Sequence, residues 1–124
     1  MKRAALYMLM LPAWAVGADM ESLLQRVPVK AAESRNPFAG NPNAAQAGAK
    51  LFSRECASCH GPNGEGSGKA PALAAPDVAG ALPGTLFWIL RNGSLKRGMP
   101  SFAHLPEAQR WQIVTFLKTM QARD

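Results

Sequence analysis

Hydrophobic positions recur at helical spacing before the two cysteines of the chain. In the segment AAQAGAKLFSREC, Gly48, Phe52 and Cys56 lie four apart on one face, and polar side chains occupy the other face. This spacing predicts an amphipathic helix. Asn43 and Gln46 are suited to cap its start. The helix leads directly into the cysteine motif.

Two further helices follow from the pattern. Residues 85–92, TLFWILRN, predict a short apolar helix that ends at Gly93, and Pro106 suits the first turn of a last helix. Residues 61–83 are rich in Gly and Pro, show neither helical nor strand periodicity, and predict a long loop. No strand pattern appears, so we expect an all-α fold of three to four short helices. The last helix carries an apolar stripe made of Ile113, Phe116, Leu117 and Met120.

The start of the chain has the features of an export signal. A basic beginning, MKR, precedes an apolar run over residues 4–16 and the small residues VGA. This pattern predicts a signal peptide over residues 1–18 and a mature chain that begins at Asp19 in the periplasm. The run is short for a bilayer span and contains Pro12, which disfavours the alternative of an uncleaved membrane anchor. After cleavage we expect no stable membrane insertion.

The remaining chain divides into an arm and a domain. Residues 19–43 contain three prolines and the turn-rich stretch NPFAGNPN, so they predict an arm with at most one helical turn, near residues 22–26. Residues 44–124 hold all the strongly periodic segments and predict a single small domain.

The net charge and its distribution indicate which class of macromolecule the protein would bind. Without Lys2 and Arg3, 12 Lys and Arg face 8 Asp and Glu, so the formal charge falls from +6 to +4. The cations are scattered rather than clustered, which argues against a nucleic-acid partner. A mildly basic exported protein is instead suited to an acidic docking surface on another protein.

The stretch CASCH holds both cysteines and one of the two histidines, Cys56, Cys59 and His60. Four chemistries compete for it: a disulfide, a redox dithiol, half of a zinc site, and covalent haem attachment. Zinc would need the distant His104, and adjacent Cys59 and His60 would have to reach one small ion. A thioredoxin-like dithiol belongs in a βαβ context, and a disulfide across so tight a loop would stabilise little. C-x-x-C-H is also the haem c signature, in which the histidine binds the iron.

The haem interpretation gains from the rest of the sequence. Three short helices bury too little surface to stabilise a small domain easily, and a haem held by two thioethers would supply both core and crosslink. Met99, in the loop GMPSF, is a candidate sixth ligand. Met20 lies in the arm and Met120 in the apolar stripe of the last helix. His104 is the alternative ligand.

Several quoted segments together resemble class I monohaem c-type cytochromes of the bacterial periplasm. These are NAAQAGAKLFSRECASCHGPNGEG, PAL at residues 71–73, LRNG, and GMPSF followed by LPEAQRWQIVTFL. More narrowly, they are similar to cytochromes that accept electrons from PQQ-dependent dehydrogenases. The resemblance covers residues 44 to about 120. It implies a first and a last helix that cross at Gly48, with Phe52, Trp111 and Phe116 packed around the crossing.

The resemblance also implies a set of site residues. Haem c would be bound covalently by Cys56 and Cys59, with His60 and Met99 as iron ligands and the Pro71 carbonyl accepting a hydrogen bond from the His60 ring. Trp88 and Arg91 would reach the haem propionates. The pocket would be lined by Leu73, Leu86, Ile89, Leu90 and Phe102.

The function expected from the resemblance is one-electron transfer and not enzyme catalysis. The carrier would accept electrons from a dehydrogenase, either as a separate protein or as its cytochrome subunit, and pass them to a terminal oxidase or another cytochrome. Two alternatives stay open: a five-coordinate haem domain that binds or senses a gas, and a cofactor-free binding module with a Cys56–Cys59 disulfide. Cations that could steer an acidic partner are Lys50, Arg54, Lys69, Arg91, Lys96 and Arg97.

Overall fold

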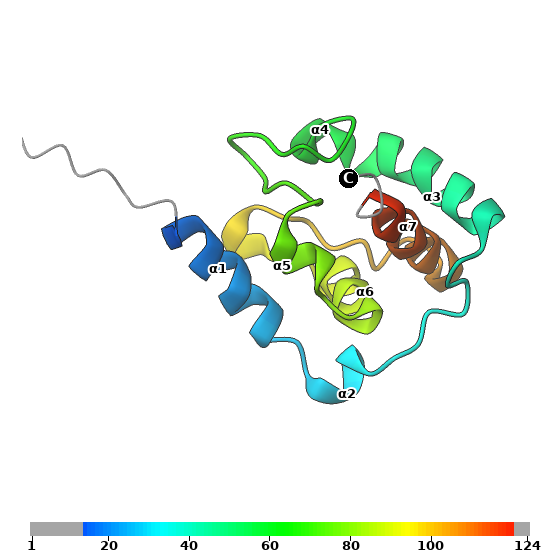
Figure 1. Ribbon diagram of the computed structural model, residues 1–124, viewed down its shortest axis with the longest axis horizontal. Coiled ribbons are helices and arrows are strands. Elements are labelled where there is room, and N and C mark those ends of the chain that lie inside the picture. The colour runs from blue at the N-terminus through cyan, green and yellow to red at the C-terminus, as the bar shows by residue number, and fades with distance from the viewer. Residues whose placement is uncertain (1–13, 121–124) are drawn as a thin grey trace, which may run out of the picture.

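The computed structural model describes residues 14–120 and consists of helices joined by loops (Figure 1). Within this part of the chain there is no strand, so the all-α prediction is confirmed. The predicted signal peptide falls largely on residues 1–13, which lie outside the described residues, and its cleavage stays a prediction. The elements are α1 (Trp14–Gln25), α2 (Val29–Ala32), α3 (Pro42–Glu55), α4 (Ala57–His60), α5 (Pro76–Ala79), α6 (Pro83–Asn92), the 3-10 helix η1 (Leu95–Arg97) and α7 (Glu107–Met120).

The N-cap of helix α3 lies two residues before the predicted cap. Asn41 is the N-cap, and its side-chain oxygen accepts a hydrogen bond of 3.0 Å from the backbone N–H of Ala44. Pro42 occupies the first helical turn, where a missing N–H costs nothing. The predicted cap at Asn43 is therefore wrong, because the Asn-Pro pair starts the helix earlier.

Helices α3 and α7 pack closely against each other through Gly48. A Cβ atom at Gly48 would overlap the carbonyl oxygen of Gln112 and would lie 2.8 Å from the Cβ of Phe116. The rings of Phe52 and Phe116 pack beside this contact with centroids 5.4 Å apart. The expected contact at Gly48 is thus present in the structure.

Trp111 takes a different place from the one expected at this contact. Its ring stacks on Phe87 of α6, with centroids 3.8 Å apart and planes 8° from parallel. The guanidinium of Arg110 lies over the Phe87 ring, 4.8 Å from its centroid. Trp111 therefore joins α7 to α6, while Phe52 and Phe116 join α3 to α7.

The arm is more ordered than the sequence predicted. Instead of at most one helical turn, it forms α1 and α2, and Leu23 and Val27 are buried against Ile89 of α6. The backbone of α2 approaches Gly84 so closely that a Cβ there would overlap the carbonyl oxygens of Ala31 and Ala32. The three prolines of this segment predicted a linker. Its apolar side chains instead pack against the domain.

The loop after α4 also contains structure that its sequence pattern did not predict. The four-residue helix α5 interrupts it, with Pro76 in the first turn and Val78 buried. The ammonium group of Lys118 in α7 donates to the carbonyl oxygens of Ala79 and Ala81, at 3.3 and 2.6 Å. Partial burial lowers the pKa of Lys118. The lysine ties the end of this loop to the last helix.

Among the described residues, no helix has both the length and the apolar character needed to cross a membrane.

Gly48→Ala tests the helix contact. The added methyl group meets backbone rather than a flexible side chain, so α3 and α7 must move apart, and we expect a loss of about 3 kcal/mol in the free energy of unfolding. Denaturant unfolding of the purified holoprotein measures it. Gly68→Ala is the matched control, because a Cβ there has no neighbour within 4 Å. Equal stability of the two variants would contradict the close contact.

Candidate functional site

The two cysteines and His60 are positioned by the junction between α3 and α4. The backbone N–H groups of Cys59 and His60 both donate to the carbonyl of Cys56, at 3.3 and 3.0 Å, which folds the motif into one tight turn. Cys56 is buried, Cys59 is exposed, and both are free thiols. Burial, with smaller effects from Glu55 and Cys59, raises the pKa of the Cys56 thiol to about 11.

The loop that follows returns Pro71 to the histidine. The Nδ1 atom of His60 lies 2.9 Å from the carbonyl oxygen of Pro71, so the hydrogen bond implied by the resemblance is present. A carbonyl can only accept, so Nδ1 carries the proton in this hydrogen bond, and in the neutral ring the free lone pair is then on Nε2. The loop is held in place by the Ser67 hydroxyl, which donates to Cys59 O at 2.6 Å, and by the Leu73 N–H, which donates to Gly64 O at 2.8 Å.

Met99 is held by a second compact loop, which follows α6. Ser94 and Met99 exchange two backbone hydrogen bonds of 2.9 and 3.0 Å, and η1 fills the turn between them. The stretch after Met99 is fastened back onto α6, because the Phe102 N–H donates to Leu90 O at 2.8 Å and the Ser101 hydroxyl donates to Arg91 O at 2.5 Å. These hydrogen bonds therefore determine where the backbone of Met99 lies.

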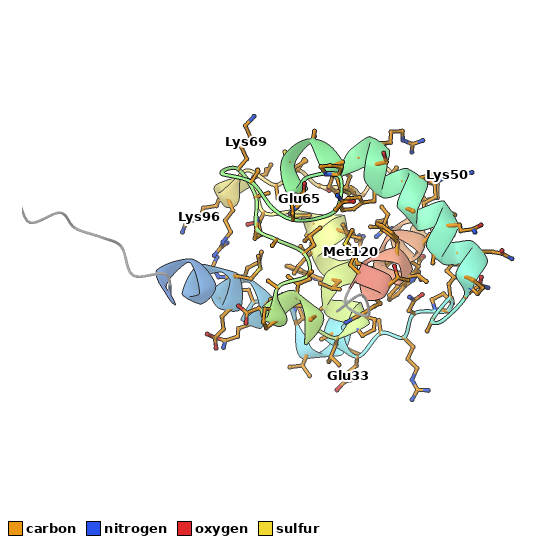
Figure 2. The ribbon with its side chains drawn as sticks, turned by 45° about the horizontal axis from the view of Figure 1, so that its top comes forward. Glu33, Lys50, Glu65, Lys69, Lys96 and Met120 are labelled. Carbon is orange, nitrogen blue, oxygen red and sulfur yellow. The ribbon has the colours of Figure 1, made fainter. Side chains whose placement is uncertain are left out.

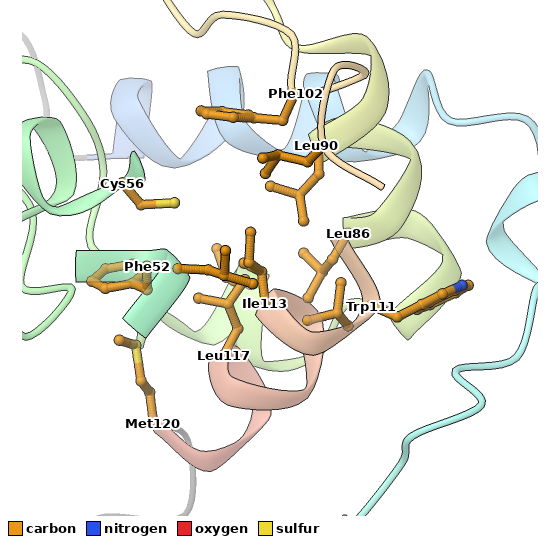
Figure 3. Packing of buried hydrophobic residues seen from close by; sticks show 13 residues of the cluster. Phe52, Cys56, Leu86, Leu90, Phe102, Trp111, Ile113, Leu117 and Met120 are labelled. Carbon is orange, nitrogen blue, oxygen red and sulfur yellow. The ribbon is translucent and has the colours of Figure 1, made fainter. Parts of the chain in front are cut away.

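The two loops meet across one cavity of about 520 Å³, a size typical of small-molecule and cofactor sites. Cys56, Cys59, His60 and Met99 all line it. Figure 3 shows part of this space, with Phe102 above it, Cys56 at its left and Ile113 below. The lining is mainly apolar and includes every residue expected for the haem pocket, namely Leu73, Leu86, Ile89, Leu90 and Phe102.

Two residues expected near the cofactor do not line the cavity. Trp88 is half-buried against the cluster of Leu23, Val27 and Ile89, and Arg91 is exposed at the end of α6. The structure places Lys69 and Arg97 in the lining instead. From the sequence both residues are predicted only as steering charges, because nothing in their local pattern indicates that two loops bring them to one cavity.

Sequence reasoning also missed the contribution of the arm. Met20, Leu23 and Leu24 of α1 line the cavity. Together with Val27 they form an i, i+3, i+4, i+7 stripe, which was a readable signal for an amphipathic helix.

The competing chemistries for the motif find no support in the geometry. Among residues 14–120, no three His, Cys, Asp or Glu side chains gather as ligands for a metal ion. The cysteines form no disulfide with each other. His104 is exposed and is absent from the lining of the cavity, so the structure does not bring it to the position of a sixth ligand.

Comparison with known families decides between the remaining interpretations. The sequence model of the family described as cytochrome C oxidase, cbb3-type, subunit III matches residues 43–117, more than half of the chain. The chain belongs to this family. No curated protein matches the chain. Members of the family are c-type cytochrome domains, so haem c is bound covalently and the protein carries electrons. The match does not support a link to PQQ-dependent dehydrogenases.

The residues of this cytochrome domain fit such a cofactor. Two thiols at the C-x-x-C-H spacing border an apolar cavity, as thioether attachment to the two vinyl groups requires. An imidazole with its Nδ1 proton engaged and a thioether line the same cavity. Two cations, Lys69 and Arg97, suit the carboxylates of a haem edge.

Gly93→Ala and Gly98→Ala test how the Met99 loop is built. Both glycines have positive φ, but Gly93 also has a ψ of −167°, a region that is essentially glycine-only, and a Cβ there would lie 2.6 Å from the carbonyl carbon of Pro100. A Cβ at Gly98 meets nothing within 4 Å. We expect Gly98→Ala to lose about 1–2 kcal/mol and Gly93→Ala clearly more, measured by thermal unfolding. A smaller loss for Gly93→Ala would contradict this description of the loop.

Proposed function

We propose that this cytochrome domain transfers single electrons through a haem whose iron is bound by His60 on one side and Met99 on the other. The observation that supports the proposal most directly is the position of the two side chains. His60 ends α4 and Met99 lies in the loop after α6, so they are far apart in the chain, yet they line one apolar cavity together with both cysteines.

The chain's own residues determine the properties of the ligands. The Pro71 carbonyl, 2.9 Å from His60 Nδ1, fixes the orientation of the ring and makes its other nitrogen a better donor. The short bridge between Ser94 and Met99 holds the backbone of Met99 beside the cavity. When bound, haem c supplies an iron that alternates between the ferrous and ferric states. The apolar lining excludes water, so little has to reorganise when the charge changes.

The proposed partners are redox proteins outside the cytoplasm, in the periplasm if the signal peptide is cleaved as predicted. We propose a dehydrogenase, as the resemblance implies, as electron donor. A terminal oxidase or another cytochrome is the proposed acceptor. The family's description as an oxidase subunit supports the acceptor side of this proposal.

One rim of the cavity has the composition of a docking surface for an acidic partner. Lys69 and Arg97 line the cavity, and Lys96 lies next to Arg97 in η1. Figure 2 shows that Lys69 and Lys96 project from the same side of the molecule, whereas Lys50 lies at the opposite side on α3. The adjacent Leu95 is 81% exposed. An apolar contact surrounded by cations favours brief, oriented docking.

Met99→Ala tests the proposed ligation. The variant keeps both cysteines and His60, so covalent haem should remain, but the iron loses the thioether that favours its ferrous form. We expect the reduction potential to fall by about 60 mV or more, which corresponds to a tenfold loss of preference for the ferrous state. The reduced variant should also bind carbon monoxide rapidly, whereas the unaltered protein should resist it. Potentiometric titration and carbon monoxide mixing measure both effects.

Met120→Ala is the control for Met99→Ala. Met120 is a buried methionine of α7 that does not line the cavity. Its truncation should leave the ferrous preference close to that of the unaltered protein. An unchanged potential and spectrum in Met99→Ala would contradict the ligation. Rapid carbon monoxide binding by the unaltered protein would favour the five-coordinate gas-binding alternative.

Lys69→Gln and Lys96→Gln test the docking surface. Each removes one cation from the cavity rim, so we expect the rate of oxidation by ferricyanide, a small anionic oxidant, to fall about twofold at low salt. The difference should vanish near 0.15 M salt, where the screening length is about 8 Å. Lys50→Gln changes the total charge equally from the other side and serves as the control. Equal slowing in all three variants would show a net-charge effect without a docking surface.

A further inference from the structure

The helix α1 brings an apolar stripe to the haem cavity from outside the family's matched residues. The match covers residues 43–117, and the stripe of Met20, Leu23, Leu24 and Val27 lies before it. Figure 1 shows α1 running beside α5 and away from the pair formed by α3 and α7. The haem cavity of this chain therefore has a wall that lies outside the matched residues.

The stripe reaches the cavity on the side of Met99. Leu23 and Val27 form a buried cluster with Ile89, and the Met99 side chain packs against the same cluster. Leu23 is only 9% exposed and also lines the cavity, as Met20 and Leu24 do. Leu23 thus links the core of the arm to the cavity and to the neighbourhood of the thioether.

The arm is fastened at two further points, which makes it part of the folded domain. The backbone of α2 lies directly against Gly84 at the start of α6. Farther along, the Asn36 side-chain amide donates to the Thr115 hydroxyl at 2.8 Å, although the two residues are 79 apart in the sequence. These anchors hold α1 in place on α6 rather than leaving it as a tail.

We propose that Met20, Leu23 and Leu24 of α1 form a structural wall of the haem cavity, and that Leu23 is a positioning residue that keeps the Met99 thioether in place on the iron. The proposal rests on the ligation of Met99 argued above. Leu23 touches no reacting atom in this scheme. It acts by filling the space beside Met99 and by excluding water from it.

The physical argument concerns the balance between a bound and a released thioether. Backbone bonds fix the Met99 loop, but the long, flexible side chain keeps its freedom unless neighbours occupy the space around it. Truncating a buried leucine leaves a void into which the Met99 side chain can turn. Such a void beside the cavity can also admit water. Release of the thioether then becomes easier without any change in Met99 itself.

The experiment compares Leu23→Ala with Leu51→Ala in the full-length holoprotein. Leu51 of α3 is equally buried, at 7% exposed, and belongs to the main core but does not line the cavity. Both variants lose the same atoms from a buried site. We expect Leu23→Ala to bind carbon monoxide in the reduced state about tenfold faster than the unaltered protein, equivalent to about 1.4 kcal/mol in thioether release. Leu51→Ala should bind it at the unaltered rate.

Two further readouts separate positioning from a general loss of stability. In the ferric protein, Leu23→Ala should weaken the absorption band that arises from the sulfur–iron bond, and its reduction potential should fall, while Leu51→Ala should change neither. Thermal unfolding of both variants measures the stability term. If Leu23→Ala does not fold, Leu23→Val removes one methylene and should show the same effects to a smaller extent.

The outcomes distinguish this inference from the proposal on which it rests. Slow carbon monoxide binding in the unaltered protein and in Leu51→Ala, with fast binding in Leu23→Ala, supports the positioning role. Slow binding in all three, with an intact sulfur–iron band, overturns that role and leaves the ligation of Met99 standing. Fast binding by the unaltered protein, without a sulfur–iron band, overturns the ligation and this inference together.

Discussion

The fold depends on a central apolar cavity that segments from the whole chain must enclose. Helices α3 and α7 can pack closely only because Gly48 lets their backbones meet, and α6 covers the remaining side through Trp111 and Phe87. The side chains that would form a dry core in a larger domain line the cavity here. In a domain this small, the bound cofactor therefore supplies packing as well as chemistry.

The two loops at the cavity show how short backbone bridges replace regular secondary structure. One loop returns Pro71 to His60, and the other holds Met99 through its bridge to Ser94. The hydrogen bonds that hold each loop join residues near one another in the sequence. Together, however, the two loops bring an imidazole and a thioether to one cavity. Such a site needs little rearrangement when an electron arrives, which suits a carrier better than a catalyst that must admit substrate.

The arm belongs to the folded domain and is not a linker that precedes it. Its sequence has the prolines of a linker, but α1 and α2 bury Leu23 and Val27 against α6. The family match begins where this segment ends, so the cavity of this protein is built partly from residues that lie outside the matched range. A segment of this kind can modify the environment of a common cofactor without altering its ligands.

The sequence by itself determined the local chemistry: the C-x-x-C-H motif, the three main helices, and the candidate ligand Met99. These follow from short-range spacing, which one chain segment specifies alone. Only the tertiary structure decided which distant residues share the cavity. It brought in Lys69, Arg97 and the stripe of α1 and left Trp88 and Arg91 outside, because the folding of loops and of the arm is determined by long-range packing. The spacing of the apolar stripe in α1 predicts a helix, but it does not indicate which surface that helix covers.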